Sequence, residues 1–137
     1  MLTVRQKPCS SCPYRKDVPS GIWDADEYDK LPRFDGDVPE QIEAEAFSVF
    51  SCHSTPDFLC AGWVGCHDMN NNLAIRMHRS PIDPAVYEYV SPVPLFASGA
   101  EASEHGKRDI PAPGPEAEEK MHKLLKQIGR RRGYPWS

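Results

Sequence analysis

The spacing of four cysteines limits the folds open to this chain more than any other feature. Cys9 and Cys12 form a C-x-x-C motif near the start of the sequence, and Cys52 and Cys60 follow in its middle. Two thiols separated by two residues can hold one metal ion or cluster, because the turn between them points both sulfurs the same way. A tetrahedral site needs two more ligands. The pattern predicts a four-cysteine metal centre, and the alternative is buried or disulfide-bonded cysteines in an ordinary domain.

The composition indicates a fold that needs such an anchor. The chain has 137 residues, of which 39% are hydrophobic, and it contains 14 prolines and 9 glycines. We therefore predict a small, loop-rich α+β fold with mostly short helices and one or two short strands, anchored by the four-cysteine site. Five cysteines are an odd number, and no apolar run near Met1 resembles a signal peptide, so we expect reduced thiols and a cytoplasmic protein. No apolar run is long enough to span a membrane.

Several residues next to these cysteines are expected to support the centre. Two residues are expected as substitute ligands: His53, which directly follows Cys52, and Cys66, the fifth cysteine of the chain. Arg15 would place a positive charge close to the sulfurs, which stabilises thiolates. His53 is more naturally a hydrogen-bond donor around the centre, and Trp63 is expected to cover it as part of the core.

The spacing of the second cysteine pair bears on the metal. Seven residues separate Cys52 from Cys60, whereas structural zinc sites usually use two tight C-x-x-C turns. Iron–sulfur clusters accept more varied spacing and favour apolar surroundings with nearby cations. Phe50, Phe58 and Trp63 supply those surroundings. We therefore expect a [4Fe–4S] cluster, with Zn²⁺ as the alternative.

Capping signals and apolar periodicity predict the secondary structure. Asp24 and Glu27 form a capping box that would begin a helix, and Ser98 and Glu101 form another, with Gly106 as the expected stop. Helices are expected over residues 25–31, 39–46, 70–79 with Asp68 as cap, 84–90 and 99–106, and a strand over 47–50 leading to Cys52.

The C-terminal quarter has its own organisation. Residues 1–110 are expected to form the metal-anchored domain and 111–115, with three prolines, a stiff linker. Residues 116–137 would form an amphipathic helix, ending at Gly129, and a basic tail. The helix should dock on the same domain through the apolar stripe Met121, Leu124, Leu125 and Ile128. The expected receptor is Phe47, Val49, Leu73 and Met77.

Two charged segments suggest partners. Arg130, Arg131 and Arg132 lie next to two aromatic residues and are candidates for contacts with nucleic acid, but the pattern favours the alternative that they complement a helix C-terminus before the end of the chain. Between Asp17 and Glu45 ten acidic residues face only two basic ones, which favours a solvated face or a basic protein surface. A protein partner is expected and a membrane is not.

The motifs resemble those of an uncharacterised cysteine-rich domain family of actinobacteria and their phages. The residues concerned are the run from Cys9 to Arg15 (C-x-x-C-P-x-R), then Phe50 to His53 (F-x-C-H), and Cys60 to Trp63 (C-A-G-W). The resemblance implies Cys9, Cys12, Cys52 and Cys60 as the matched set and leaves Cys66 outside it. A weaker similarity links C-x-x-C-P-x-R and Gly21-Ile22-Trp23 to the WhiB-like transcription factors, which bind a [4Fe–4S] cluster but space their other cysteines differently.

Three classes of function follow from these observations. The first is a non-enzymatic iron–sulfur or metal-binding protein, of phage origin on the resemblance, that regulates or binds a host protein or a transcription or nucleic-acid partner. The second is a zinc-stapled structural protein or a redox sensor. The third, which the sequence favours least, is an enzyme using Cys66 and His67 as a thiolate–imidazole pair.

Overall fold

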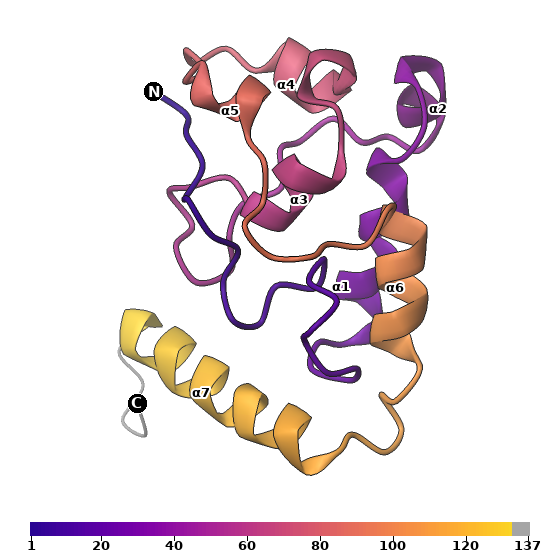
Figure 1. Cartoon of the computed structure of the whole chain (residues 1–137), viewed down its shortest axis with the longest axis vertical. Helices are drawn as coiled ribbons and strands as arrows, with labels where there is room; N and C mark the ends of the chain where they lie inside the picture. Colours follow the sequence, from indigo (N-terminus) through magenta and orange to yellow (C-terminus); the bar gives the residue numbers. More distant parts are fainter. Residues whose placement is uncertain (133–137) are drawn as a thin grey trace.

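The computed structural model describes residues 1–132, with side chains for residues 1–127, and most of its regular structure is short helices joined by loops (Figure 1). The expectation of a small fold whose regular structure is mostly short helices is confirmed. The elements are α1 (Ala25–Asp29), η1 (Leu31–Phe34), α2 (Val38–Glu43), α3 (Ala61–Cys66), η2 (Met69–Asn71), α4 (Leu73–Met77), α5 (Ala85–Glu88), α6 (Gly99–Lys107) and α7 (Pro115–Arg132).

The β-structure of residues 1–132 consists of isolated bridges, so the strand predicted over residues 47–50 is wrong. The bridges join Leu2 to Ile82, Val4 to Leu59, Arg15 to Leu95, and Ser51 to Leu59. Around the last of these, the Cys60 N–H donates to the Phe50 carbonyl at 2.8 Å and the Cys52 N–H to the Phe58 carbonyl at 2.9 Å. Pairing between the segments around Ser51 and Leu59 is limited to this bridge and the two hydrogen bonds beside it.

The predicted capping signals mostly begin helices where expected. The Asp24 side chain accepts from the Glu27 N–H at 3.0 Å, and the Ser98 hydroxyl accepts from the Glu101 N–H at 3.1 Å. The helix predicted over 70–79 is only Leu73–Met77, because Asn72 caps it while Asp68 caps η2 instead. The helix predicted over 84–90 is likewise shorter, at Ala85–Glu88.

The core is built around α3, which the sequence did not predict as a helix. Trp63, Tyr14 and Leu59 are fully buried there. Helix α6 packs against α1 and η1 at very close range: a Cβ at Gly106 would lie 2.0 Å from the Tyr28 ring. Gly106 was predicted to end α6, but the helix continues to Lys107 and the glycine instead allows this close packing.

Helix α7 crosses one end of the molecule beneath the N-terminal loops (Figure 1). Its buried residues Ala117 and Leu124 form a small separate cluster with Val18 and Ile22. The buried side of α7 therefore lies against Val18 and Ile22. The expected receptor of Phe47, Val49, Leu73 and Met77 is wrong, and Phe47 and Met77 are 46% and 55% exposed.

The predicted apolar stripe of α7 and its predicted end also need correction. Met121 packs against the small cluster, but Leu125, which was expected in the stripe, is 55% exposed. The helix continues past Gly129 to Arg132. The side chains of Ile128 and of Arg130, Arg131 and Arg132 lie outside the described part of the chain, as do residues 133–137 entirely.

Candidate metal centre

The four predicted cysteines come from two loops. In the first loop the Cys12 N–H donates to the Cys9 carbonyl and the Arg15 N–H to the Cys12 carbonyl, each at 3.1 Å, so Cys9 and Cys12 lie on successive turns. In the second loop Cys52 follows the bridge residue Ser51, and Cys60 is the residue that precedes α3. All four are free thiols.

The sulfurs meet as two pairs. Cys12 Sγ and Cys60 Sγ lie 3.7 Å apart in the buried interior. The thiols of Cys9 and Cys52 are also close enough to share a hydrogen bond. Within the described part of the chain, however, no three or more His, Cys, Asp or Glu side chains are arranged to hold a metal ion, so the metal centre stays a prediction.

Backbone N–H groups point at three of the four sulfurs. Those of Tyr14 and Gly62 act to lower the pKa of Cys12, that of Trp63 acts to lower the pKa of Cys60, and those of Ser54 and Thr55 act to lower the pKa of Cys52. Such donors stabilise a thiolate more than a thiol.

The sulfur pairs shift one another's pKa values in opposite directions. The hydrogen bond from Cys9, helped by the Thr55 hydroxyl and the N–H groups, lowers the pKa of Cys52 to about 5, although burial opposes it. The hydrogen bond from Cys60 likewise lowers the pKa of Cys12. The same bonds, together with burial, raise the pKa values of the donors Cys9 and Cys60. Each pair therefore contains one cysteine whose pKa is lowered and one whose pKa is raised.

Gly62 of the C-A-G-W motif makes room for the sulfur of Cys12. A Cβ at this position would lie 2.4 Å from Cys12 Sγ and 2.7 Å from Tyr14 Cβ. Real atoms do not approach so closely, so only glycine fits here without displacing the thiol.

Arg15, which was expected beside the centre, is held by the first cysteine loop and by Asp17. Arg15 Nη1 donates to the Pro8 carbonyl at 3.1 Å and to that of Cys9 at 3.4 Å, while Asp17 holds the rest of its guanidinium. The pKa of Arg15 is raised, first by Asp17 and further by the charges of Cys12 and Cys9. Arg15 therefore fixes the first loop and lies within electrostatic reach of its sulfurs.

His53 and Trp63 flank the centre in different ways. His53 Nε2 is hydrogen-bonded to Glu27 Oε2 at 2.9 Å, which orients its ring toward α1. Trp63 is fully buried in the core and directs its backbone N–H at Cys60.

Trp23 connects the two cysteine loops, and sequence reasoning gave it no role. Its Nε1–H donates to the Ser11 carbonyl at 3.1 Å, and its ring lies over that of His53 with centroids 4.3 Å apart. The ring thus bridges the residue before Cys12 and the residue after Cys52. The only signal in the sequence was the Gly-Ile-Trp run.

Helix α7 also contacts both cysteine loops. Lys120 Nζ donates to the Ser10 carbonyl at 3.1 Å, and Gln127 Nε2 donates to the Ser54 carbonyl at 3.4 Å. Ser10 lies between Cys9 and Cys12, and Ser54 follows Cys52 by two residues. The helix therefore spans the outer side of the proposed centre.

Cys66 and His67 are not arranged as a nucleophile and its base. Burial, with a contribution from Asp35, raises the pKa of Cys66 to about 12, which keeps it a thiol at neutral pH. His67 Nδ1 contacts the Trp63 carbonyl and its Nε2 contacts Asp35 Oδ1, both at 2.9 Å. Both ring nitrogens are engaged, so His67 ties α3 to η1 and α6.

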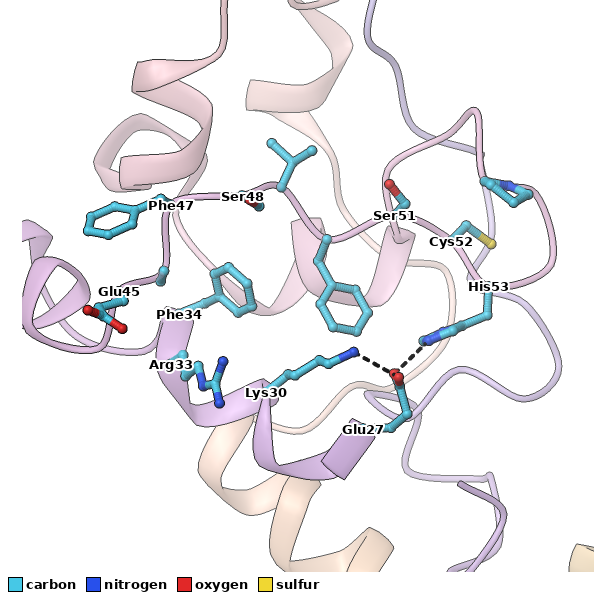
Figure 2. Close-up of a pocket in the computed structure, with 14 residues that line it drawn as sticks. Glu27, Lys30, Arg33, Phe34, Glu45, Phe47, Ser48, Ser51, Cys52 and His53 are labelled. Atoms are coloured by element: carbon cyan, nitrogen blue, oxygen red, sulfur yellow. Dashed lines mark hydrogen bonds and ion pairs between the residues drawn. The ribbon is translucent and has the colours of Figure 1, made fainter. Parts of the chain in front are cut away.

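A pocket of about 790 Å³ opens beside Cys52 (Figure 2). One wall comes from α1 and η1, where Lys30 and His53 both pair with Glu27. The other wall is the loop between α2 and Cys52. The lining residues are Glu27, Lys30, Arg33, Phe34, Glu45, Ala46, Phe47, Ser48, Val49, Phe50, Ser51, Cys52, His53 and Pro56.

Comparisons with known proteins add one relationship. Over the described residues, no helix has the length and apolar character that crossing a membrane requires. No curated protein and no solved structure matches the chain. A family model matches residues 4–131, which takes in all five cysteines and most of α7. The chain therefore belongs to a family of unknown function (DUF6283).

Proposed function

We propose that the protein is a non-enzymatic metal–thiolate protein in which Cys9, Cys12, Cys52 and Cys60 hold one metal centre that anchors the fold. The observation that carries this proposal is the buried pair of free thiols Cys12 and Cys60, whose sulfurs lie 3.7 Å apart, together with Cys9 and Cys52, which shift one another's pKa. Backbone N–H groups aimed at three of the sulfurs add support, because they favour the thiolate form that binds metal.

Different observations favour Zn²⁺ and a [4Fe–4S] cluster as the group bound in the centre. Four sulfurs arranged tetrahedrally around Zn²⁺ at about 2.3 Å would lie about 3.8 Å apart, close to the Cys12–Cys60 separation. A [4Fe–4S] cluster is larger and would require the pairs to spread. Its support is the aromatic surroundings of Phe50 and Trp63 and the nearby charge of Arg15. Either group would serve here to bind the two loops together.

Anaerobic purification followed by metal analysis distinguishes Zn²⁺ from the [4Fe–4S] cluster. One zinc per chain, without colour, would establish zinc. Four irons and four sulfides, with visible absorbance that bleaches in air, would establish the cluster, and loss of fold on bleaching would favour the redox sensor. Protein that is folded and free of metal under both zinc-replete and iron-replete expression would refute the proposal.

The ligand set is tested by single serine substitutions. Cys9→Ser, Cys12→Ser, Cys52→Ser and Cys60→Ser should each abolish stoichiometric metal binding and destabilise the fold, because metal binding and folding are coupled in a domain with a small core. Cys66→Ser is the matched control and should retain the metal. If Cys66→Ser loses metal while one of the other four retains it, the assignment is wrong.

A regulatory or interaction role is the further part of the proposal. The thiol of Cys66 has a raised pKa and both ring nitrogens of His67 make structural contacts, which favours a binding protein over an enzyme. A protein partner or a nucleic acid at the basic C-terminal end of the chain, and a phage origin, rest on the sequence alone. Binding of nucleic acid through Arg130–Arg132 should weaken steeply as salt increases, and triple alanine substitution should flatten that slope.

A further inference from the structure

The pocket beside Cys52 has features that the metal centre does not explain. Cys52 lies at one end of it, and the remaining lining comes from α1, η1 and the loop after α2. Its volume, about 790 Å³, lies within the range of small-molecule sites. The question is which ligand its unused groups would recognise.

Aromatic rings form the apolar part of the pocket. Phe34 and Phe50 are buried and pack edge to face, with centroids 6.0 Å apart. Phe47 lines the same pocket and is 46% exposed, although Phe is normally buried. A flat apolar group entering here would cover Phe47 and meet the other two rings.

Unused hydrogen-bond donors lie along both walls. Among the described residues, the Arg33 guanidinium forms no hydrogen bond or ion pair, and neither do the hydroxyls of Ser48 and Ser51. The backbone N–H groups of Ser48 and Val49 have no partner in that part of the chain either. Lys30, by contrast, is held by Glu27 at 2.8 Å. A ligand anion would satisfy the donors, with Arg33 as its main charge partner.

Glu45 limits the charge of that anion. It lies at the end of α2 with a φ of 57°, a conformation that a non-glycine residue adopts at some cost. Its carboxylate lines the pocket and has no partner among the described residues. Lys30 and Arg33 are thus balanced by Glu27 and Glu45, which disfavours a ligand with several negative charges.

We propose that this pocket binds a small aromatic monoanion, with the ring against Phe47, Phe34 and Phe50 and the carboxylate at Arg33. The ligand would lie beside Cys52, so it would contact the protein next to the proposed metal centre. The proposal rests on the pocket alone and holds whichever group the cysteines bind.

Calorimetry on the purified chain of 137 residues tests this with 2-naphthoate as the probe. We expect 2-naphthoate to bind, and both its neutral amide and cyclohexanecarboxylate to bind at least about tenfold more weakly, since each lacks the charge or the ring. Benzene-1,3,5-tricarboxylate should bind no better than 2-naphthoate. Ring-current shifts of the Phe47 protons on titration would locate the ligand.

Two exposed positions provide the variants. Arg33→Gln and Phe47→Ala should each weaken 2-naphthoate binding about tenfold or more without loss of fold, which circular dichroism would verify. Arg76→Gln, at an exposed arginine on α4, is the control and should change nothing. The proposal is overturned if 2-naphthoate does not bind, if the amide binds equally well, or if Arg33→Gln binds as the unmodified protein does.

Discussion

At the scale of single residues, two positions show how local chemistry serves the site. Gly62 is required because its missing side chain leaves space for the sulfur of Cys12. Glu45 is the converse case, since a larger residue stands where the backbone favours glycine. The Glu45 N–H donates to the Ile42 carbonyl and the Ala46 N–H to the Gln41 carbonyl. These two bonds form a Schellman motif at the end of α2, with Glu45 in its left-handed position. Neither fact can be read from residue spacing, because both depend on backbone placement.

Gly62→Ala should therefore damage the centre. The new methyl group would force Cys12 or Tyr14 aside, at a cost of about 1–3 kcal/mol in the free energy of unfolding, and would lower metal content. Gly114→Ala is the control, because no atom lies within 4 Å of the position of its Cβ. Urea unfolding and metal analysis of both variants would check this, and equal stability would show that the Cys12 loop can move.

Glu45→Gly should stabilise the protein by up to about 1 kcal/mol, because glycine adopts positive φ without strain. Glu43→Gly, in the last turn of α2, should instead destabilise it by about as much. Thermal unfolding would reveal the difference. A lower melting temperature for Glu45→Gly would mean that the Glu45 carboxylate makes a stabilising interaction.

At the scale of elements, prediction succeeded where the signal was local. The caps at Asp24 and Ser98 and the existence of a long C-terminal helix follow from short-range chemistry. The strand over 47–50 and the receptor for α7 failed, because both depend on which distant segment lies opposite. The α7 stripe was partly right: Met121 and Leu124 face the protein, but the inner face continues to Ala117 rather than to Leu125.

Leu124→Asp should release α7 from the protein. Leu124 is 7% exposed against Val18 and Ile22, and losing this burial while adding a charge should cost about 3 kcal/mol. Leu125→Asp is the matched control, since Leu125 is 55% exposed on the same turn. Protease sensitivity near residue 114 would report undocking. Equal sensitivity of the two variants would contradict the observed orientation of the helix.

At the scale of the whole molecule, the cysteine loops and the helices are tied together by polar contacts that sequence reasoning did not find. His67 joins α3 to Asp35, and Asp35 also accepts from the N–H groups of Gly99 and Ala100 at 2.7 and 2.9 Å. The four cysteines could be proposed as ligands from the sequence because thiols are uncommon and the C-x-x-C spacing is explicit. Asp35 was not, because one acidic residue among ten carries no signal until α6 packs beside it.

This network predicts an acid-sensitive contribution to stability. Burial acts to raise the pKa of Asp35, but the hydrogen bonds from His67, Gly99 and Ala100 outweigh it and lower that pKa below its ordinary value. A lowered pKa in the folded state means that the contribution is present above the unfolded value, about 3.9, and is lost as pH falls through the folded value. Asp35→Asn should therefore lower stability near neutral pH and flatten its decline in acid. Asp26→Asn, at an exposed site on α1, is the control. If the two variants lose stability with the same dependence on pH, the proposed contribution of the Asp35 network is excluded.

The last prediction concerns the coupling of α7 to the metal centre. Lys120 contacts the loop of Cys9 and Cys12, and Gln127 contacts the loop of Cys52, so α7 meets both halves of the proposed site. The small cluster around Leu124 is separate from the main core, and this leaves α7 dependent on how well those loops are held. If a metal holds them, removing it with a chelator should increase amide hydrogen exchange along residues 115–127 before it does so in α6, which packs on α1 and η1. Readdition of the metal should restore protection in α7. Exchange that rises uniformly, or that leaves α7 unchanged, would show that the helix and the cysteine loops are independent.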